Sequence, residues 1–152
     1  MTTCRNMLGW REWLALPELG IGHIKAKVDT GARTSCLHAF YVDTFRSRGR
    51  DYARFGVHPM QRNDRQIVHC EAQILDQRQV TDSGGHRELR FVISTRLVLL
   101  DFDDTVELTL TNRDSMKFRM LLGRTTLSAG SFCIDPSASY LAGRYAAHKE
   151  PR

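Results

Sequence analysis

Two short segments constrain the fold most, Asp29-Thr30-Gly31-Ala32 and Leu121-Leu122-Gly123-Arg124. The first puts a carboxylate on a tight turn after an apolar strand pattern formed by Ile24, Ala26 and Val28. The second is an apolar pair that runs into glycine, where another backbone segment can pack closely. The chain has 152 residues, one Asp-Thr-Gly and no internal repeat. It is long enough for one domain with a real core but too short for two lobes, so a site that needs two such turns needs two copies of the chain.

The rest of the chain is patterned mainly as β-strands. Thr105 to Thr111 alternates most clearly, with Val106, Leu108 and Leu110 predicted to face inward and Glu107, Thr109 and Thr111 outward. A break at Asp101–Asp104 predicts an antiparallel hairpin between this strand and the preceding one. The other expected strands are Trp10–Leu16, Ile21–Val28, Ser35–Val42, Ile67–Leu75, Leu89–Leu100, Phe118–Leu122 and Phe132–Ile134.

One short helix is expected, from Thr125 to Ala129, with Gly130 placed to end it. We therefore predict a single, mainly β domain over residues 1–152, with a core from about 10 to 141 and tails at 1–8 and 144–152.

The chain is basic, with a net charge of +5, and Arg supplies 18 of its 22 basic residues. Many of these arginines fall in residues 43–65, which lack clear periodicity and are expected to form a long exposed loop or a loosely ordered hairpin. Three interpretations stay open: a solvated loop, an acidic peptide partner, or nucleic acid. No aromatic ladder or RNA-binding motif accompanies the charges, which makes nucleic acid the least favoured.

Asp29 is the candidate catalytic residue, because two carboxylates that share one proton can activate a water for peptide hydrolysis. Thr30 has a hydroxyl that can lock the turn, and Gly31 offers an N–H to the carboxylate. Ala32 is small and leaves room for a substrate. Val28 and Leu37 are expected to anchor the turn in the core. The alternative is an ordinary turn, since these residue types favour turns in any protein.

Together with Val28–Ser35, the segments Asp82–His86, Leu108–Asp114 and Met120–Arg124 resemble one bacterial family of retropepsin-like aspartic proteases. That family is catalogued as ATP-dependent zinc proteases and is associated with glutamate ligases of the RimK type. The resemblance runs from about Trp10 to Leu141. It implies a closed retropepsin-like β-barrel, a homodimer and a catalytic dyad of two Asp29 residues. It also points to acidic or glutamylated peptides as substrates.

The chain departs from the viral members of this group at Arg33. Viral retropepsins usually carry an acidic residue there, which pairs with the Arg of the Gly-Arg signature. Arg124 therefore needs another partner, such as Asp114 or Asp135. Leu122, Gly123 and Arg124 are expected to support the site structurally.

A flap that closes over substrate is expected between the two signatures. Asp82-Ser83-Gly84-Gly85 is the candidate tip, since two glycines give a mobile turn; an ordinary surface turn is the alternative. Ser83, Gly84 and Gly85, together with Ala32 and Arg33, are the expected substrate contacts.

No metal site or cofactor is predicted, despite the family's name. The chain has no His-Glu-x-x-His and no Walker loop, and the adjacent pair His69-Cys70 would point to opposite faces of a strand. Cys36 is expected in the core. The cysteine spacing and the lack of a leader or an apolar span predict reduced thiols, no membrane contact and a cytoplasmic protein. A homodimeric aspartic peptidase is thus the leading interpretation, and a non-catalytic module that binds acidic peptides on the same fold is the alternative.

Overall fold

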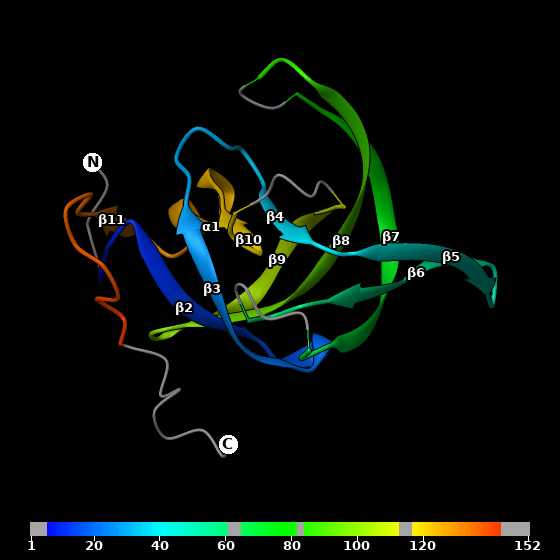
Figure 1. The fold of residues 1–152 in the computed structure, drawn as a ribbon, viewed down its shortest axis with the longest axis horizontal. Coiled ribbons are helices and arrows are strands. Elements are labelled where there is room, and N and C mark those ends of the chain that lie inside the picture. Colours follow the sequence, from blue (N-terminus) through cyan, green and yellow to red (C-terminus); the bar gives the residue numbers. More distant parts are fainter. Residues whose placement is uncertain (1–5, 61–64, 82–83, 113–116, 144–152) are drawn as a thin grey trace.

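Six strands close into a barrel in the computed structural model, which describes residues 6–60, 65–81, 84–112 and 117–143. Their order around the barrel is β2 (Arg11–Leu16), β3 (Ile21–Val28), β10 (Met120–Leu122), β4 (Ser35–His38), β9 (Phe102–Thr111) and β8 (Arg87–Leu99). The pairing of Ala15 with Val98 joins β2 to β8 and closes the barrel (Figure 1). The predicted mainly β barrel is confirmed.

The barrel interior is filled by one face of each strand, because successive side chains of a strand point to opposite sides. Val106, Leu108 and Leu110 of β9 lie in this core, as their alternation predicted. Thr109 and Thr111 point the other way, yet each is only 2% exposed. The predicted outward direction of these two side chains is therefore right, but both are buried and not exposed to solvent. The antiparallel hairpin of β8 and β9 is confirmed, with Leu99 opposite Phe102.

The sheet continues beyond the barrel through β7 (Val68–Thr81), β6 (Arg50–Val57) and β5 (Tyr41–Ser47). β5 and β6 form a regular antiparallel hairpin, so of the two structures expected for residues 43–65 the hairpin is the one found, over residues 43–57. The far end of the hairpin projects away from the barrel (Figure 1), whereas Ala53, Phe55 and Val57 of β6 are fully buried and belong to the hydrophobic core. Its charges are partly paired, since Arg54 lies 2.8 Å from Glu71 and Arg46 lies 3.3 Å from Asp51.

The first strand of the described chain is paired with the last strand. β1 (Asn6–Leu8) pairs in parallel with β11 (Phe132–Ile134), and Leu8 is fully buried. The prediction of a tail over residues 1–8 is therefore wrong for residues 6–8. Nearby, the buried Glu12 carboxylate accepts hydrogen bonds from the backbone N–H groups of Gly9, Leu141 and Ala142 at 2.6, 2.9 and 2.9 Å.

The short helix α1 (Arg124–Ala129) begins one residue before its predicted start and ends at Gly130, as expected. A single turn of 3-10 helix, Pro17–Leu19, lies between β2 and β3.

Cys36 and Cys70 are free thiols, whereas Cys133 takes part in a disulfide, so the expectation of reduced thiols is wrong for Cys133. Within the described ranges, no helix has the length and apolar character needed to cross a membrane.

Candidate active site

Asp29 lies at the end of β3, on a turn held by its own hydrogen bonds. The N–H of Gly31 donates to Asp29 Oδ1 at 3.0 Å, as the sequence predicted, and the N–H of Ala32 donates to the Asp29 carbonyl at 3.2 Å. Asp29 is half-buried and Thr30 is exposed. These two hydrogen bonds hold the Asp29 carboxylate in a defined position on the turn of one copy of the chain.

The second signature is packed directly against this turn. β10 runs parallel to β3 with Leu122 opposite Val28, and the N–H of Asp29 donates to the Leu122 carbonyl at 2.9 Å. The backbone N–H groups of Arg124 and Thr125 donate to the carbonyls of Ala32 and Arg33 at 2.8 and 3.0 Å. Two segments far apart in the sequence therefore form one hydrogen-bonded unit.

The Arg124 side chain completes this unit. Its Nη1 donates to the backbone carbonyls of Thr30 and Gly31 at 3.1 and 3.3 Å. The expected partner Asp135 is instead bonded to the backbone and hydroxyl of Ser137, and the pKa of its carboxyl is lowered by those two hydrogen bonds. The other expected partner, Asp114, lies outside the described residues. Arg124 thus stabilises the turn through carbonyl oxygens, which the sequence did not suggest.

Ser35, at the start of β4, connects the site to the helix. Its hydroxyl accepts from the N–H of Gly123 at 2.9 Å and lies 3.0 Å from the Thr126 hydroxyl. The predicted core anchors behave as expected: Leu37 is fully buried, and Val28 is packed against the core.

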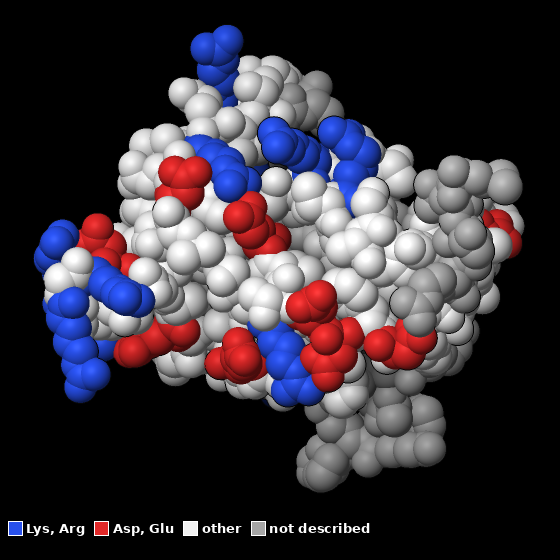
Figure 2. All heavy atoms as spheres, turned by 180° about the vertical axis from the view of Figure 1, so that it is seen from behind, with Lys and Arg blue, Asp and Glu red and all other residues white. Residues whose placement is uncertain are grey.

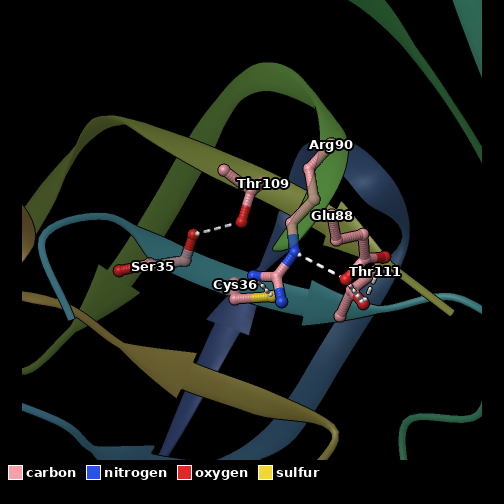
Figure 3. Close-up of polar contacts among 6 residues, drawn as sticks. All are labelled: Ser35, Cys36, Glu88, Arg90, Thr109 and Thr111. Atoms are coloured by element: carbon pink, nitrogen blue, oxygen red, sulfur yellow. Dashed lines mark hydrogen bonds and ion pairs between the residues drawn. The ribbon is translucent and has the colours of Figure 1, made fainter. Parts of the chain in front are cut away.

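A polar layer lies on the outer face of the barrel beside β4 (Figure 3). The Arg90 guanidinium on β8 donates to Glu88 at 3.0 Å through Nε and to the Cys36 sulfur at 3.4 Å through Nη1. Both Glu88 carboxylate oxygens accept from the Thr111 hydroxyl, at 2.9 and 3.0 Å, and the Thr109 hydroxyl donates to the Ser35 carbonyl at 3.4 Å. Cys36 is buried, as predicted, and its sulfur contacts this polar layer. Burial raises the pKa of its thiol, and the nearby Arg90 charge opposes that rise.

Sequence reasoning missed Glu88 and Arg90 because it followed only the apolar residues of β8. The signal that could have found these two residues is the alternation of side chains along β8. If Phe91, Ile93, Leu97 and Leu99 face one side, then residues 88, 90 and 92 share the other side with Thr109 and Thr111.

The candidate flap is the end of a long hairpin. β7 and β8 pair as far as Thr81 and Arg87, and Gly85 takes the left-handed conformation, with φ of 83°. Gly84 and Gly85 are exposed, whereas Asp82 and Ser83 lie outside the described residues. In Figure 1 this hairpin curves toward the end of the barrel that carries residues 29–34. A turn at Gly84-Gly85 is confirmed; its role as a flap stays a prediction.

Charge is unevenly distributed on the face seen in Figure 2. Apart from the projecting β5–β6 hairpin, Lys and Arg gather mainly at the upper end, which is the end toward which the β7–β8 hairpin curves. Most Asp and Glu lie lower. The end of the molecule that carries the Asp29 turn is therefore the more basic one on this face.

Across the described ranges, no group of three or more His, Cys, Asp or Glu side chains is arranged to hold a metal ion. His69 and Cys70 point to opposite sides of β7, as predicted: His69 is exposed and bonded to the Tyr41 hydroxyl at 2.8 Å, and Cys70 is buried and donates to the Leu19 carbonyl at 3.3 Å.

Comparison with known proteins gives three findings. Residues 7–145 match the model of a family described as retropepsin-like aspartic endopeptidase RimB. Two curated relatives, both named probable alpha-L-glutamate ligase, are those of Shewanella halifaxensis and Shewanella pealeana. They are 42% and 43% identical over 95% and 94% of this chain, which spans only 31% of the length of either. The crystal structure of a Legionella pneumophila protein of unknown function has the same fold, with a TM-score of 0.74, 24% identity, and coverage of 91% of this chain and 98% of that one.

Proposed function

The chain belongs to the family of retropepsin-like aspartic endopeptidases, and on that premise we propose that it hydrolyses peptide bonds as a pair of identical copies. The observation that carries the proposal is the way in which the Leu122–Arg124 segment fixes the Asp29 turn. One copy supplies one such carboxylate, and a second copy supplies the other.

Two Asp29 carboxylates that face each other across the pair would share one proton, because like charges at short distance cannot both be ionised. The ionised carboxylate removes a proton from a water held between the two, and the resulting hydroxide adds to the peptide carbonyl carbon. The protonated carboxylate donates to the carbonyl oxygen. Transfer of a proton to the amide nitrogen then breaks the C–N bond and releases an amine and a carboxylic acid.

The neighbouring residues have supporting roles in this proposal. The Gly31 N–H holds the Asp29 carboxylate in place, and Thr30 is the next residue of the turn, where it can contact the second copy. Arg124 fixes the turn through two backbone carbonyls. Ala32, Arg33 and the Gly84-Gly85 turn would contact the peptide, with the β7–β8 hairpin as the flap.

We infer that the substrates are acidic peptides. Arg33 is exposed next to the Asp29 turn, and the surface at this end of the molecule is basic in Figure 2. The relatives named as probable glutamate ligases contain a region that is similar to this chain. A peptidase joined to an enzyme that adds glutamate would meet chains that carry many carboxylates.

The test is Asp29→Asn, compared with Asp43→Asn, which changes an exposed carboxylate on β5. Hydrolysis of glutamate-rich peptides, followed by mass spectrometry, should fall to background in Asp29→Asn and stay at the wild-type rate in Asp43→Asn. Sedimentation should show that Asp29→Asn still forms the pair. Unchanged cleavage by Asp29→Asn would refute the proposal.

A second candidate function is a module that binds acidic peptides without cleaving them. It is favoured by the exposed Arg33 at a position where viral relatives carry an acidic residue. It predicts salt-sensitive peptide binding with no cleavage product between acidic and neutral pH. Nucleic acid is less favoured, because Arg46 and Arg54 of the basic hairpin are engaged with Asp51 and Glu71.

A further inference from the structure

Arg90 is held in one orientation on the outer face of the barrel. Its side chain is 10% exposed, and that of its partner Glu88 is 25% exposed. A nearly buried ion pair is weak evidence for a purely stabilising role, because removing two charges from water costs about as much as their attraction returns. Glu88 is fixed in turn by Thr111, so the guanidinium is positioned from two sides (Figure 3).

Arg90 still has hydrogen-bonding capacity. A guanidinium carries five N–H donors. The contacts described for Arg90 use Nε, toward Glu88, and Nη1, toward Cys36. The remaining donors lie in the plane of a rigid fork that matches a carboxylate in shape and charge.

The position of Arg90 relative to Asp29 follows from the sheet. β10 lies between β3 and β4, with Leu121 opposite both Lys27 and Cys36. Cys36 is therefore two strand spacings, about 10 Å, from Lys27, and Asp29 follows two residues after Lys27. An extended peptide advances roughly 3.3–3.6 Å per residue, so this distance corresponds to about three residues. Arg90 lies against Cys36, on the face that points away from the barrel core.

We propose that Arg90 is a specificity-determining residue that binds the carboxylate side chain of a peptide residue two or three positions from the bond that is cut. This inference rests on the proposed function and extends it from a general preference for acidic peptides to one subsite. Glu88, Thr111 and Cys36 act as positioning residues, because they hold the guanidinium at the base of the β7–β8 hairpin.

The experiment uses pairs of peptides that differ only by Glu or Gln at one position, for each of the four positions on either side of the cleavage site. The wild type should prefer Glu at one position, two or three residues from the cut. Arg90→Met should reduce that preference in kcat/KM by about 10- to 100-fold, the range expected for one lost hydrogen-bonded charge contact. The rate on the matching Gln peptide should stay within about threefold, and Arg90→Lys should retain part of the preference.

Two further variants keep the test decisive. Arg96→Met removes another arginine of β8, which is paired with Asp103 away from the site, and should leave every preference unchanged. The double variant of Glu88→Gln with Arg90→Met removes both charges, so no unpaired carboxylate is left buried if the single variant fails to fold. It should show the same loss of preference.

The same peptides are also measured for binding in the Asp29→Asn background, by fluorescence anisotropy. Glu-selective binding that is lost with Arg90→Met, but without cleavage by the wild type, would refute the peptidase and support the subsite. Cleavage with an unchanged Glu preference in Arg90→Met would refute the subsite and leave the peptidase standing. The inference would also be overturned if Arg33→Met, and not Arg90→Met, abolished the preference.

Discussion

Gly123 packs against the peptide unit between Thr34 and Ser35 so closely that a side chain at this position would collide with backbone. A β-carbon on Gly123 would lie 2.6 Å from the Thr34 carbonyl carbon and 2.8 Å from the Ser35 nitrogen. Backbone cannot move aside as a flexible side chain can. The close contact lets the Leu122–Arg124 segment hydrogen-bond to the loop that presents Asp29, so this glycine sets the geometry of the site.

Replacing Gly123 by alanine should therefore displace the loop or strain it. We expect Gly123→Ala to lower the free energy of unfolding by about 1–3 kcal/mol, the usual cost of an overpacked site, and to reduce any peptidase activity further. Gly22→Ala is the matched control, since nothing lies within 4 Å of a β-carbon at Gly22. Urea denaturation measures both. Equal stability of the two variants would mean that the close contact is not maintained in solution.

Arg124→Met should make the Asp29 turn more flexible while lowering the free energy of unfolding only slightly. The variant loses the hydrogen bonds to the Thr30 and Gly31 carbonyls, but Arg124 is exposed, so the free energy of unfolding should fall by only about 1 kcal/mol. Hydrogen exchange at the Gly31 and Ala32 amides should become faster. Arg33→Met, which removes a side chain from the same loop but keeps the backbone contact of residue 33, should leave that exchange unchanged. Protected amides in Arg124→Met would contradict this role.

Glu12→Gln should destabilise the whole domain. The Glu12 carboxylate is fully buried and accepts three backbone N–H groups, whereas an amide would turn its NH₂ toward at least one of those donors. A buried donor without an acceptor costs about 1–3 kcal/mol, so a loss of at least that size is expected in thermal or urea unfolding. Glu18→Gln, at an exposed position, should have almost no effect. Hydrogen exchange should also speed up at Leu141 and Ala142, and the prediction fails if those amides stay protected.

Cys70 should make the protein less stable at high pH. Burial raises the pKa of its thiol from 9.0 to about 12. Between these values the unfolded chain has lost the thiol proton while the folded chain keeps it, so stability that is present below pH 9 decreases as the pH rises toward 12, by up to about 1.4 kcal/mol per pH unit. Unfolding free energies from pH 8 to 11 should fall more steeply for the wild type than for Cys70→Ala. Parallel curves would show that this thiol does not titrate differently in the two states.

Much of the site could be read from local sequence. The Asp29 turn, the Gly31 N–H bond, the burial of Leu37 and the helix that ends at Gly130 depend on residues close together in the chain, and conformational preferences act over that range. The partner of Arg124 could not be read in this way. A guanidinium bonds equally well to a carboxylate or to carbonyl oxygens, and only the packed loop offers the carbonyls of Thr30 and Gly31.

The sequence by itself determined that this chain is a β domain with one acidic turn and a glycine segment suited to pack against it. The tertiary structure alone decided that Thr109 and Thr111 are buried, that Glu88 and Arg90 meet Cys36, and that the basic segment after residue 41 is an ordered hairpin. Alternation along a strand says which side chains share a face, but it does not say what covers that face. That depends on strand order, which brings together residues more than fifty positions apart, such as Cys36 and Arg90.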